Sequence, residues 1–357
     1  KASEKYISTE EYNHKCRENV MMFTAEWRKL TEEMGYFVDL DHPYITYDNK
    51  YIETLWWLLK QLYNKGLLYK GYTIQPYSPG AGTGLSSHEL NQPGCYRDVK
   101  DLTATVQFLI RDPKEEWTKW GKPYFVAWTT TPWTLPSNVA LCVGPKIDYV
   151  SVETYNLYNG EPITIIMAEN LVKAYLKPEQ ECKEGELAPF DKEKKMCPWR
   201  ITGHFKGTEL EGMHYEQLMP WVKPCEKVDD FAPKFVTEYA EAHPEKVFTG
   251  EDGRDKFVEM ESEAFRVILG DYVTTDDGTG IVHIAPTFGA DDAKVAKDAN
   301  IPALYLINKK GETRPMVDLQ GKFYLIDELD TNFVKACVDD EKYGHHAGDY
   351  VKNAYDP

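Results

Sequence analysis

Residues 124–138 read Tyr-Phe-Val-Ala-Trp-Thr-Thr-Thr-Pro-Trp-Thr-Leu-Pro-Ser-Asn and hold the signal that decides the fold. The opening apolar run is typical of a buried strand, and threonines also favour extended backbone. Pro132 and Pro136 then remove two backbone donors and fix φ, so a stiff loop should follow the strand. A stiff loop rich in hydroxyl groups suits a small polar ligand such as a ribose. Ordinary strand and turn preferences explain the same residues equally well, so both interpretations stay open.

The sequence around this stretch is dense in short strands. Apolar and alternating segments predict strands over residues 102–110, 124–129, 149–154, 163–167, 265–274, 280–284, 303–307 and 322–326. Helices are expected between them at residues 171–175, 229–242 and 290–299. Lys309-Lys310-Gly311-Glu312 has the composition of a hairpin turn. This density of strands predicts a mixed α/β fold that is mainly β, with a β-barrel-like domain and peripheral helices.

The region before the first strand has a different texture. Residues 8–35 and 48–65 each carry an apolar face at helical spacing and predict amphipathic helices. Residues 67–77 predict a strand. The glycine run at 79–84 lacks the Gly-Lys-Ser/Thr ending of a phosphate loop, so we interpret it as a turn. Residues 178–196, rich in Pro, Glu, Lys and Asp, predict a solvated loop.

These changes of texture divide the chain into three parts. We expect residues 1–100 to form a helical segment and a connecting ribbon, residues 101–326 to form the β-barrel-like domain, and residues 327–357 to form a return segment. Neither end resembles a natural terminus, so we expect the 357 residues to be a piece of a longer protein.

Composition narrows the function. The chain has 41 Lys+Arg against 58 Asp+Glu, a formal net charge of −17. Such a surface repels polyanions at long range, which argues against coating nucleic acid but permits recognition of one terminal nucleotide. No apolar run approaches the roughly 18 residues of a membrane span, so we expect a cytoplasmic protein without a membrane partner. The 7 cysteines are scattered without a Cys-x-x-Cys pair and predict reduced thiols.

A second stretch concentrates chemistry-bearing residues. Residues 276–292 read Asp-Asp-Gly-Thr-Gly-Ile-Val-His-Ile-Ala-Pro-Thr-Phe-Gly-Ala-Asp-Asp and predict a turn, a strand, a loop and a helix start. Asp291 and Asp292 would then fall in the first helical turn, where carboxylates stabilise the helix dipole or cap N–H groups. Alternatively, one of these carboxylates faces a pocket shared with His283 and binds a cation.

Together the two stretches resemble the inserted editing domain of the class I synthetases specific for Ile, Val and Leu. The valyl and leucyl enzymes carry Thr-Thr-Arg-Pro in the first motif, whereas Thr-Thr-Thr-Pro-Trp-Thr-Leu-Pro at residues 129–136 resembles the isoleucyl type. The second motif, Gly-Thr-Gly-x-Val-His-x-Ala-Pro at residues 278–286 with Asp292 beyond it, resembles the same family. The resemblance extends over the ribbon at 71–101 and the helices of 1–70, so it covers essentially the whole chain.

This resemblance implies hydrolysis of the ester in mischarged Val-tRNA(Ile), which is post-transfer proofreading. It implies that Asp292 accepts the α-ammonium of the amino acid and that His283 lines the amino-acid pocket; with Thr131 they make up the expected catalytic set. The residues expected to bind the terminal adenosine and the ester are Thr129, Thr130, Trp133, Thr134 and Asn138. A buried aromatic without ligand contact is an equally good interpretation of Trp133.

The resemblance also sets limits and partners. The class I signatures His-x-Gly-His and Lys-Met-Ser-Lys-Ser are absent, so we expect no aminoacylation by this part alone. Residues 79–82 read Pro-Gly-Ala-Gly where some relatives carry zinc-binding Cys-x-x-Cys, so we expect neither a metal nor a cofactor. Expected partners are the 3′ end of tRNA(Ile) carrying valine and the remainder of the synthetase, in a monomer.

Other functions stay open. The chain could be an inactive module that positions the tRNA 3′ end, or the editing domain of a valyl- or leucyl-type synthetase. A serine or zinc hydrolase is disfavoured, because neither Gly-x-Ser-x-Gly nor His-Glu-x-x-His occurs.

Overall fold

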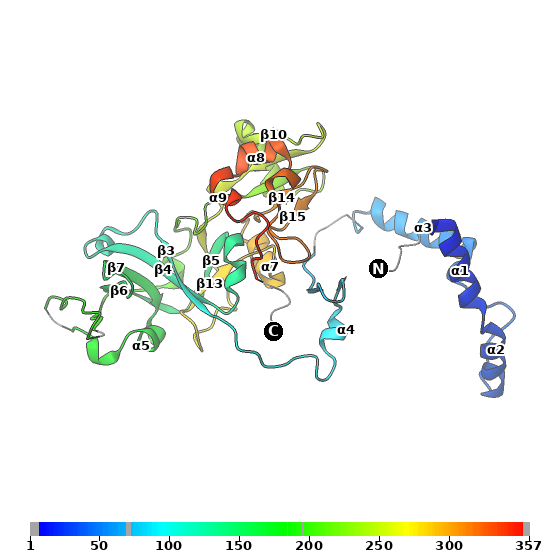
Figure 1. Cartoon of the computed structure of the whole chain (residues 1–357), viewed down its shortest axis with the longest axis horizontal. Coiled ribbons are helices and arrows are strands. Elements are labelled where there is room, and N and C mark those ends of the chain that lie inside the picture. Colours follow the sequence, from blue (N-terminus) through cyan, green and yellow to red (C-terminus); the bar gives the residue numbers. More distant parts are fainter. Residues whose placement is uncertain (1–6, 69–72, 184, 195, 353–357) are drawn as a thin grey trace. The chain divides into compact units, whose positions relative to one another are not determined.

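The N-terminal unit is Lys1–Lys70, and the regular secondary structure in its described part is helical. The structure is a computed structural model that describes residues 7–68, 73–183, 185–194 and 196–352 (Figure 1). The helices of this unit are α1 (Thr9–Met21), α2 (Thr24–Glu33) and α3 (Asn49–Asn64). The prediction for 48–65 is confirmed. The single helix predicted over 8–35 is wrong, because Phe23 leaves the helical conformation with φ −112° and ψ 17° and separates α1 from α2.

The second unit, Gly71–Pro357, begins with a small hairpin. β1 (Tyr77–Ser78) pairs with β2 (Thr83–Gly84), and the glycine run between them is the predicted turn. The short helix α4 (Ser87–Leu90) follows. Part of the strand predicted at 67–77 lies outside the described residues, and in its described part only Tyr77 belongs to a strand.

A five-stranded sheet forms the first layer of the β-rich region. Its strands, in spatial order, are β3 (Ala104–Leu109), β4 (Lys122–Thr129), β7 (Pro162–Ala168), β6 (Asp148–Tyr155) and β8 (Arg200–Lys206). β4 and β7 run parallel, and the other neighbours are antiparallel. The strands predicted at 102–110, 124–129, 149–154 and 163–167 are therefore confirmed.

A three-stranded sheet brings the two sequence motifs together. In it β5 (Ala140–Val143) lies between β12 (Arg266–Leu269), which is parallel to it, and β13 (Ile281–Ile284), which is antiparallel. β5 follows the first motif directly and β13 lies inside the second, with His283 opposite Leu141. β13 also packs against β4. The pairing therefore places the loop after β4 beside the segment that carries His283.

The remaining elements cover this core. The other strands are β9 (Cys225–Val228), β10 (Val247–Thr249), β11 (Lys256–Glu259), β14 (Leu306–Ile307) and β15 (Thr313–Arg314). The other helices are α5 (Val172–Tyr175), α6 (Lys234–Ala242), α7 (Ala290–Asp298), α8 (Thr331–Cys337) and α9 (Asp340–Gly344). The turn predicted at 309–312 joins β14 to β15. The strand predicted at 322–326 is wrong, because this stretch makes only isolated bridges and then enters a 3-10 turn.

The fold is mixed and mainly β, as predicted. The barrel-like closure is not seen among the described residues, because the strands form separate sheets and β3 and β8 remain at the edges of the largest one. One large apolar cluster nevertheless runs through the five-stranded and three-stranded sheets. The seven cysteines, all of them among the described residues, are thiols outside any disulfide bond. Across the described ranges, every helix is too short or too polar to cross a membrane.

Candidate functional site

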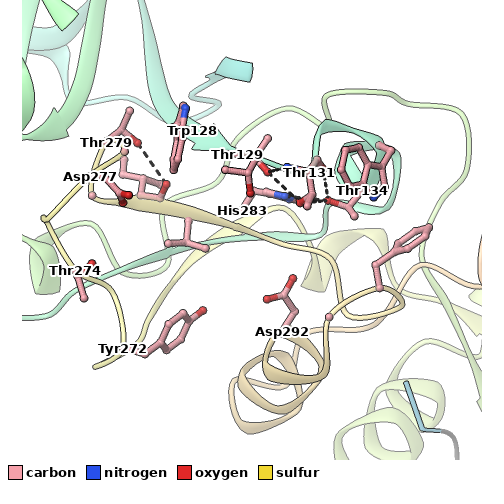
Figure 2. Close-up of a pocket in the computed structure, with 18 residues that line it drawn as sticks. Trp128, Thr129, Thr131, Thr134, Tyr272, Thr274, Asp277, Thr279, His283 and Asp292 are labelled. Atoms are coloured by element: carbon pink, nitrogen blue, oxygen red, sulfur yellow. Dashed lines mark hydrogen bonds between the residues drawn. The ribbon is translucent and has the colours of Figure 1, made fainter. Parts of the chain in front are cut away.

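Both sequence motifs border one cavity of about 560 Å³. Figure 2 shows its lining, with the β4 loop and β13 on one side and α7 on the other. The predicted residues that line it are Thr129, Thr130, Thr131, Trp133, Thr134, His283 and Asp292. A cavity of this size holds a ligand of small-molecule dimensions. Thr130 and Asp277 on its border are exposed, so the cavity opens to solvent.

The threonines at the end of β4 and in the loop after it form a row of hydrogen-bonded groups along the cavity. The Thr131 N–H donates to Thr129 Oγ1 at 3.0 Å, and the two hydroxyl oxygens lie 3.2 Å apart. The Thr134 hydroxyl donates to the Thr131 carbonyl at 2.8 Å. Pro132 and Pro136 hold this loop in the 3-10 helix Pro132–Ser137. The loop therefore offers preorganised hydroxyl groups, as its stiffness predicts.

His283, on β13, extends this row of hydrogen-bonded groups. Its Nε2 lies 3.1 Å from Thr134 Oγ1. The Thr134 hydroxyl proton is directed at a carbonyl, so its oxygen accepts, and this assigns the ring proton to Nε2. His283 is only 7% exposed, and burial lowers its pKa to about 4. The imidazole is therefore neutral at pH 7, and its Nδ1 is enclosed without a partner among the described residues.

Asp292 lies across the cavity in the first turn of α7. Its Oδ2 accepts the Ala285 N–H at 2.8 Å, which fixes the carboxylate beside the end of β13. Burial raises the pKa of Asp292, with a smaller contribution from the Asp291 carboxylate. No ion pair to Asp292 occurs within the described part of the chain, so this half-buried carboxylate faces the cavity without a cation. Asp291, its neighbour, is exposed and does not line the cavity.

The far end of the cavity contains residues that the sequence did not single out as ligands. Trp128, Asp277 and Thr279 lie there together, while Tyr272 faces the side on which Asp292 lies (Figure 2). Gly278 has φ +71°, and a Cβ atom there would lie 3.1 Å from the Trp128 ring, so glycine lets the turn approach the indole. The run Asp276–Gly280 carried a turn signal, which gave no indication that the turn borders a pocket.

Asn138 is the predicted site residue that the structure does not bring into the cavity. It is 2% exposed, and its side chain is engaged on both sides. Its amide nitrogen donates to the Ala140 carbonyl at 2.9 Å, and its Oδ1 accepts the Tyr215 hydroxyl at 2.7 Å. The amide thus anchors the start of β5, and we leave Asn138 out of the ligand contacts proposed below.

Comparison with known proteins gives consistent similarities. Residues 1–266 match the family described as tRNA synthetases class I (I, L, M and V). The "Isoleucine--tRNA ligase" of Bacteroides thetaiotaomicron is 61% identical over 353 residues, which is 99% of this chain and 28% of that protein. That of Porphyromonas gingivalis is 56% identical over 352 residues, again 99% of this chain and 28% of the relative. The chain therefore spans little more than a quarter of the length of these relatives.

Among solved structures, the editing domain of the P. knowlesi cytosolic leucyl-tRNA synthetase is similar to this chain at 13% identity and a TM-score of 0.34. The match covers 65% of this chain and 75% of that one. A likeness this distant supports no conclusion about the site.

Proposed function

The chain belongs to the class I tRNA synthetases (I, L, M and V), and from this premise we propose that its cavity is an editing site. In this proposal the chain is the editing part of an isoleucyl-tRNA synthetase, and the cavity hydrolyses the ester that joins valine to tRNA(Ile). The observation that carries the proposal is the carboxylate of Asp292, which borders the cavity without a cationic partner among the described residues.

Every aminoacyl ester carries a free α-ammonium, whatever its side chain. A fixed, half-buried carboxylate is the natural partner for it, because charge-assisted hydrogen bonds are stronger than neutral ones. The Ala285 N–H holds one oxygen of Asp292, which leaves the other to receive the ammonium. Asp292 would therefore orient the amino acid and leave its side chain to be sized by other groups.

The row of threonine hydroxyl groups would hold the ester and the ribose. The hydroxyl groups of Thr129, Thr131 and Thr134 lie in a row along the cavity. The oxygens of Thr129 and Thr131 are 3.2 Å apart, and those of Thr131 and Thr134 are 3.5 Å apart. They can donate to and accept from a ribose hydroxyl, an ester oxygen or a water molecule. A row of small hydroxyl groups of this kind suits the positioning of a substrate more than nucleophilic attack on it.

The reaction itself needs no strong protein nucleophile. Water adds to the ester carbonyl, the C–O bond to the ribose breaks, and the ribose oxygen leaves with a proton, giving free valine and uncharged tRNA. An ester is already activated, so orientation and electrostatic stabilisation supply the catalysis. The neutral His283 imidazole limits the pocket without adding a charge that would repel the α-ammonium.

A hydrolytic site is useful here because binding energy alone discriminates weakly between valine and isoleucine. One methylene in an apolar pocket is worth only about 1–3 kcal/mol, and the established ratio for isoleucine against valine in this enzyme family is about 150-fold. A second site that accepts the smaller residue removes the remaining errors. The partners in this proposal are the 3′ end of tRNA(Ile) and the remainder of the synthetase, and the net charge of −17 fits a part that receives only the strand end.

A deacylation assay tests the proposal. The full-length synthetase is mixed with Val-tRNA(Ile) or Ile-tRNA(Ile) in the absence of ATP, and release of amino acid is followed. We expect rapid loss of valine and slow loss of isoleucine. Equal, uncatalysed rates for both esters would contradict the proposal and favour an inactive module that positions the tRNA end. Preferential hydrolysis of another aminoacyl ester would point to a valyl- or leucyl-type site.

A further inference from the structure

A second cavity, of about 420 Å³, meets the proposed editing site at Trp133. It is bordered by the 3-10 helix Pro132–Ser137, by Asp101 and Leu102, and by the segment 346–352. Trp133 lines both cavities, so its indole is a wall that they share. A contact that fixes the orientation of this indole therefore also affects the shape of the editing cavity.

Lys352 makes the contact with this wall. Its Nζ lies 3.7 Å from the centre of the Trp133 ring, at cation–π distance. The same ammonium forms an ion pair with Asp101, and this pair lowers the pKa of the Asp101 carboxyl. Their side chains are 37% and 39% exposed, so the contact is partly screened from water. One ammonium thus joins the segment before β3, the segment after α9 and the loop after β4.

The backbone around Lys352 is held without its side chain. The Gly348 N–H donates to the Phe323 carbonyl, and the Phe323 N–H donates to the Asp349 carbonyl. The Val351 N–H donates to the Gly321 carbonyl at 2.9 Å. Loss of the ammonium should therefore leave the segment folded in place and remove its hold on Trp133.

Trp133 is connected to the proposed chemistry by a short covalent path. Thr134 is the next residue in the same 3-10 helix, and its Oγ1 accepts from His283 Nε2 at 3.1 Å. Because the two residues are adjacent in this short helix, a displacement of the Trp133 backbone would also move Thr134 and change the length of that hydrogen bond. Catalysis by positioning is sensitive to small displacements of this kind, because an error of about 1 Å can cost about a hundredfold in rate.

We propose that Lys352 is a positioning residue of the editing site. Its ammonium, anchored by Asp101, fixes the Trp133 indole and through it the helix that sets the contact between Thr134 and His283. The inference rests on the proposed function, and it adds that a shift between the segments of Asp101 and Lys352 is transmitted to the pocket.

The test compares variants of the full-length synthetase in deacylation of Val-tRNA(Ile). Lys352→Met keeps the apolar stem and removes the charge, and we expect kcat to fall about three- to tenfold, the range for a partly exposed cation–π contact. KM for the tRNA and the thermal midpoint should stay near wild type. Lys352→Arg retains a cation that can pair with Asp101 and stack on Trp133. Its kcat should therefore stay within about twofold of the wild-type value.

A matched control lies in the same region. The Lys322 Nζ lies 4.9 Å from the centre of the Tyr350 ring, so Lys322→Met removes a cation–π contact that does not involve Trp133 and should leave kcat unchanged. An unchanged kcat in Lys352→Met, a rise in KM alone, or an equal loss in Lys322→Met or Lys352→Arg would overturn the inference. If wild-type enzyme itself fails to deacylate Val-tRNA(Ile), the proposed function fails instead, so the two failures are distinguishable.

Discussion

The buried imidazole of His283 should make stability depend on pH in a measurable way. Burial lowers its pKa from 6.5 to about 4 in the folded protein, whereas the unfolded chain keeps the usual value. Between these two values the unfolded state binds more protons than the folded state. The free energy of unfolding therefore falls as the pH is lowered, and the His283 contribution is fully present only above about pH 6.5.

The size of this effect follows from the two pKa values. At about 1.36 kcal/mol per pKa unit, the difference between the folded and unfolded pKa of His283 corresponds to about 3 kcal/mol in the free energy of unfolding, lost in full only at pH values below both pKa values. Between pH 7 and pH 5 only part of that change occurs, which gives about 2 kcal/mol. His283→Gln removes the titrating group and keeps a polar side chain at this position.

Urea unfolding of the 357-residue chain and of His283→Gln, each at pH 7 and pH 5, measures the difference. Other titrating groups are common to both proteins, so they cancel in the comparison. We expect wild type to lose about 2 kcal/mol more than the variant on going to pH 5. Equal losses in the two proteins would refute the assignment of a neutral, buried imidazole to the cavity wall.

Three further substitutions test other parts of the account. In the full-length synthetase, His283→Ala should enlarge the pocket and weaken the distinction between Val-tRNA and Ile-tRNA, or slow both; unchanged deacylation of both esters would remove His283 from the site. Gly280→Ala should lower the free energy of unfolding by about 1–3 kcal/mol, since Gly280 has φ +75° and a Cβ atom there would lie 2.5 Å from Ala168 Cβ, and an unchanged melting temperature would argue against this. Tyr215→Phe removes the hydrogen bond to Asn138 and should cost about 1–3 kcal/mol of stability with little effect on deacylation; a loss of activity at unchanged stability would return Asn138 to the site.

Local signals in the sequence were enough to place the two motifs on the right elements. The apolar run before Trp128 is β4, the prolines stiffen the following loop, and Asp292 lies in the first turn of α7. Each of these features depends on residues that are close in sequence. The strand β5 was missed, because Ala140–Val143 is a short apolar run without alternation and a buried strand of this kind has no periodic signal.

Contacts between distant residues decided the rest. The hydrogen bond between Thr134 and His283 joins residues 149 positions apart, and no local pattern predicts it. The resemblance implied a ligand contact for Asn138, whereas in the structure its Oδ1 accepts the hydroxyl of Tyr215, 77 positions away. The break between α1 and α2 at Phe23 was also hidden, because the apolar spacing continues across it. Tertiary partners, which the sequence does not display, therefore determine which polar side chains are free to bind.

The central claim is that Asp292 binds the α-ammonium of the ester, and one pair of variants tests it most directly. Deacylation of Val-tRNA(Ile) is measured for full-length Asp292→Ala and Asp291→Ala, with circular dichroism to confirm folding. Truncating one partner of a buried charge pair costs about 2–5 kcal/mol, so Asp292→Ala should slow deacylation by roughly thirtyfold or more. Asp291→Ala should cost much less, because Asp291 is exposed and does not line the cavity. Full activity in both folded variants would contradict the account, and loss of activity in Asp291→Ala alone would assign the ammonium contact to the other carboxylate.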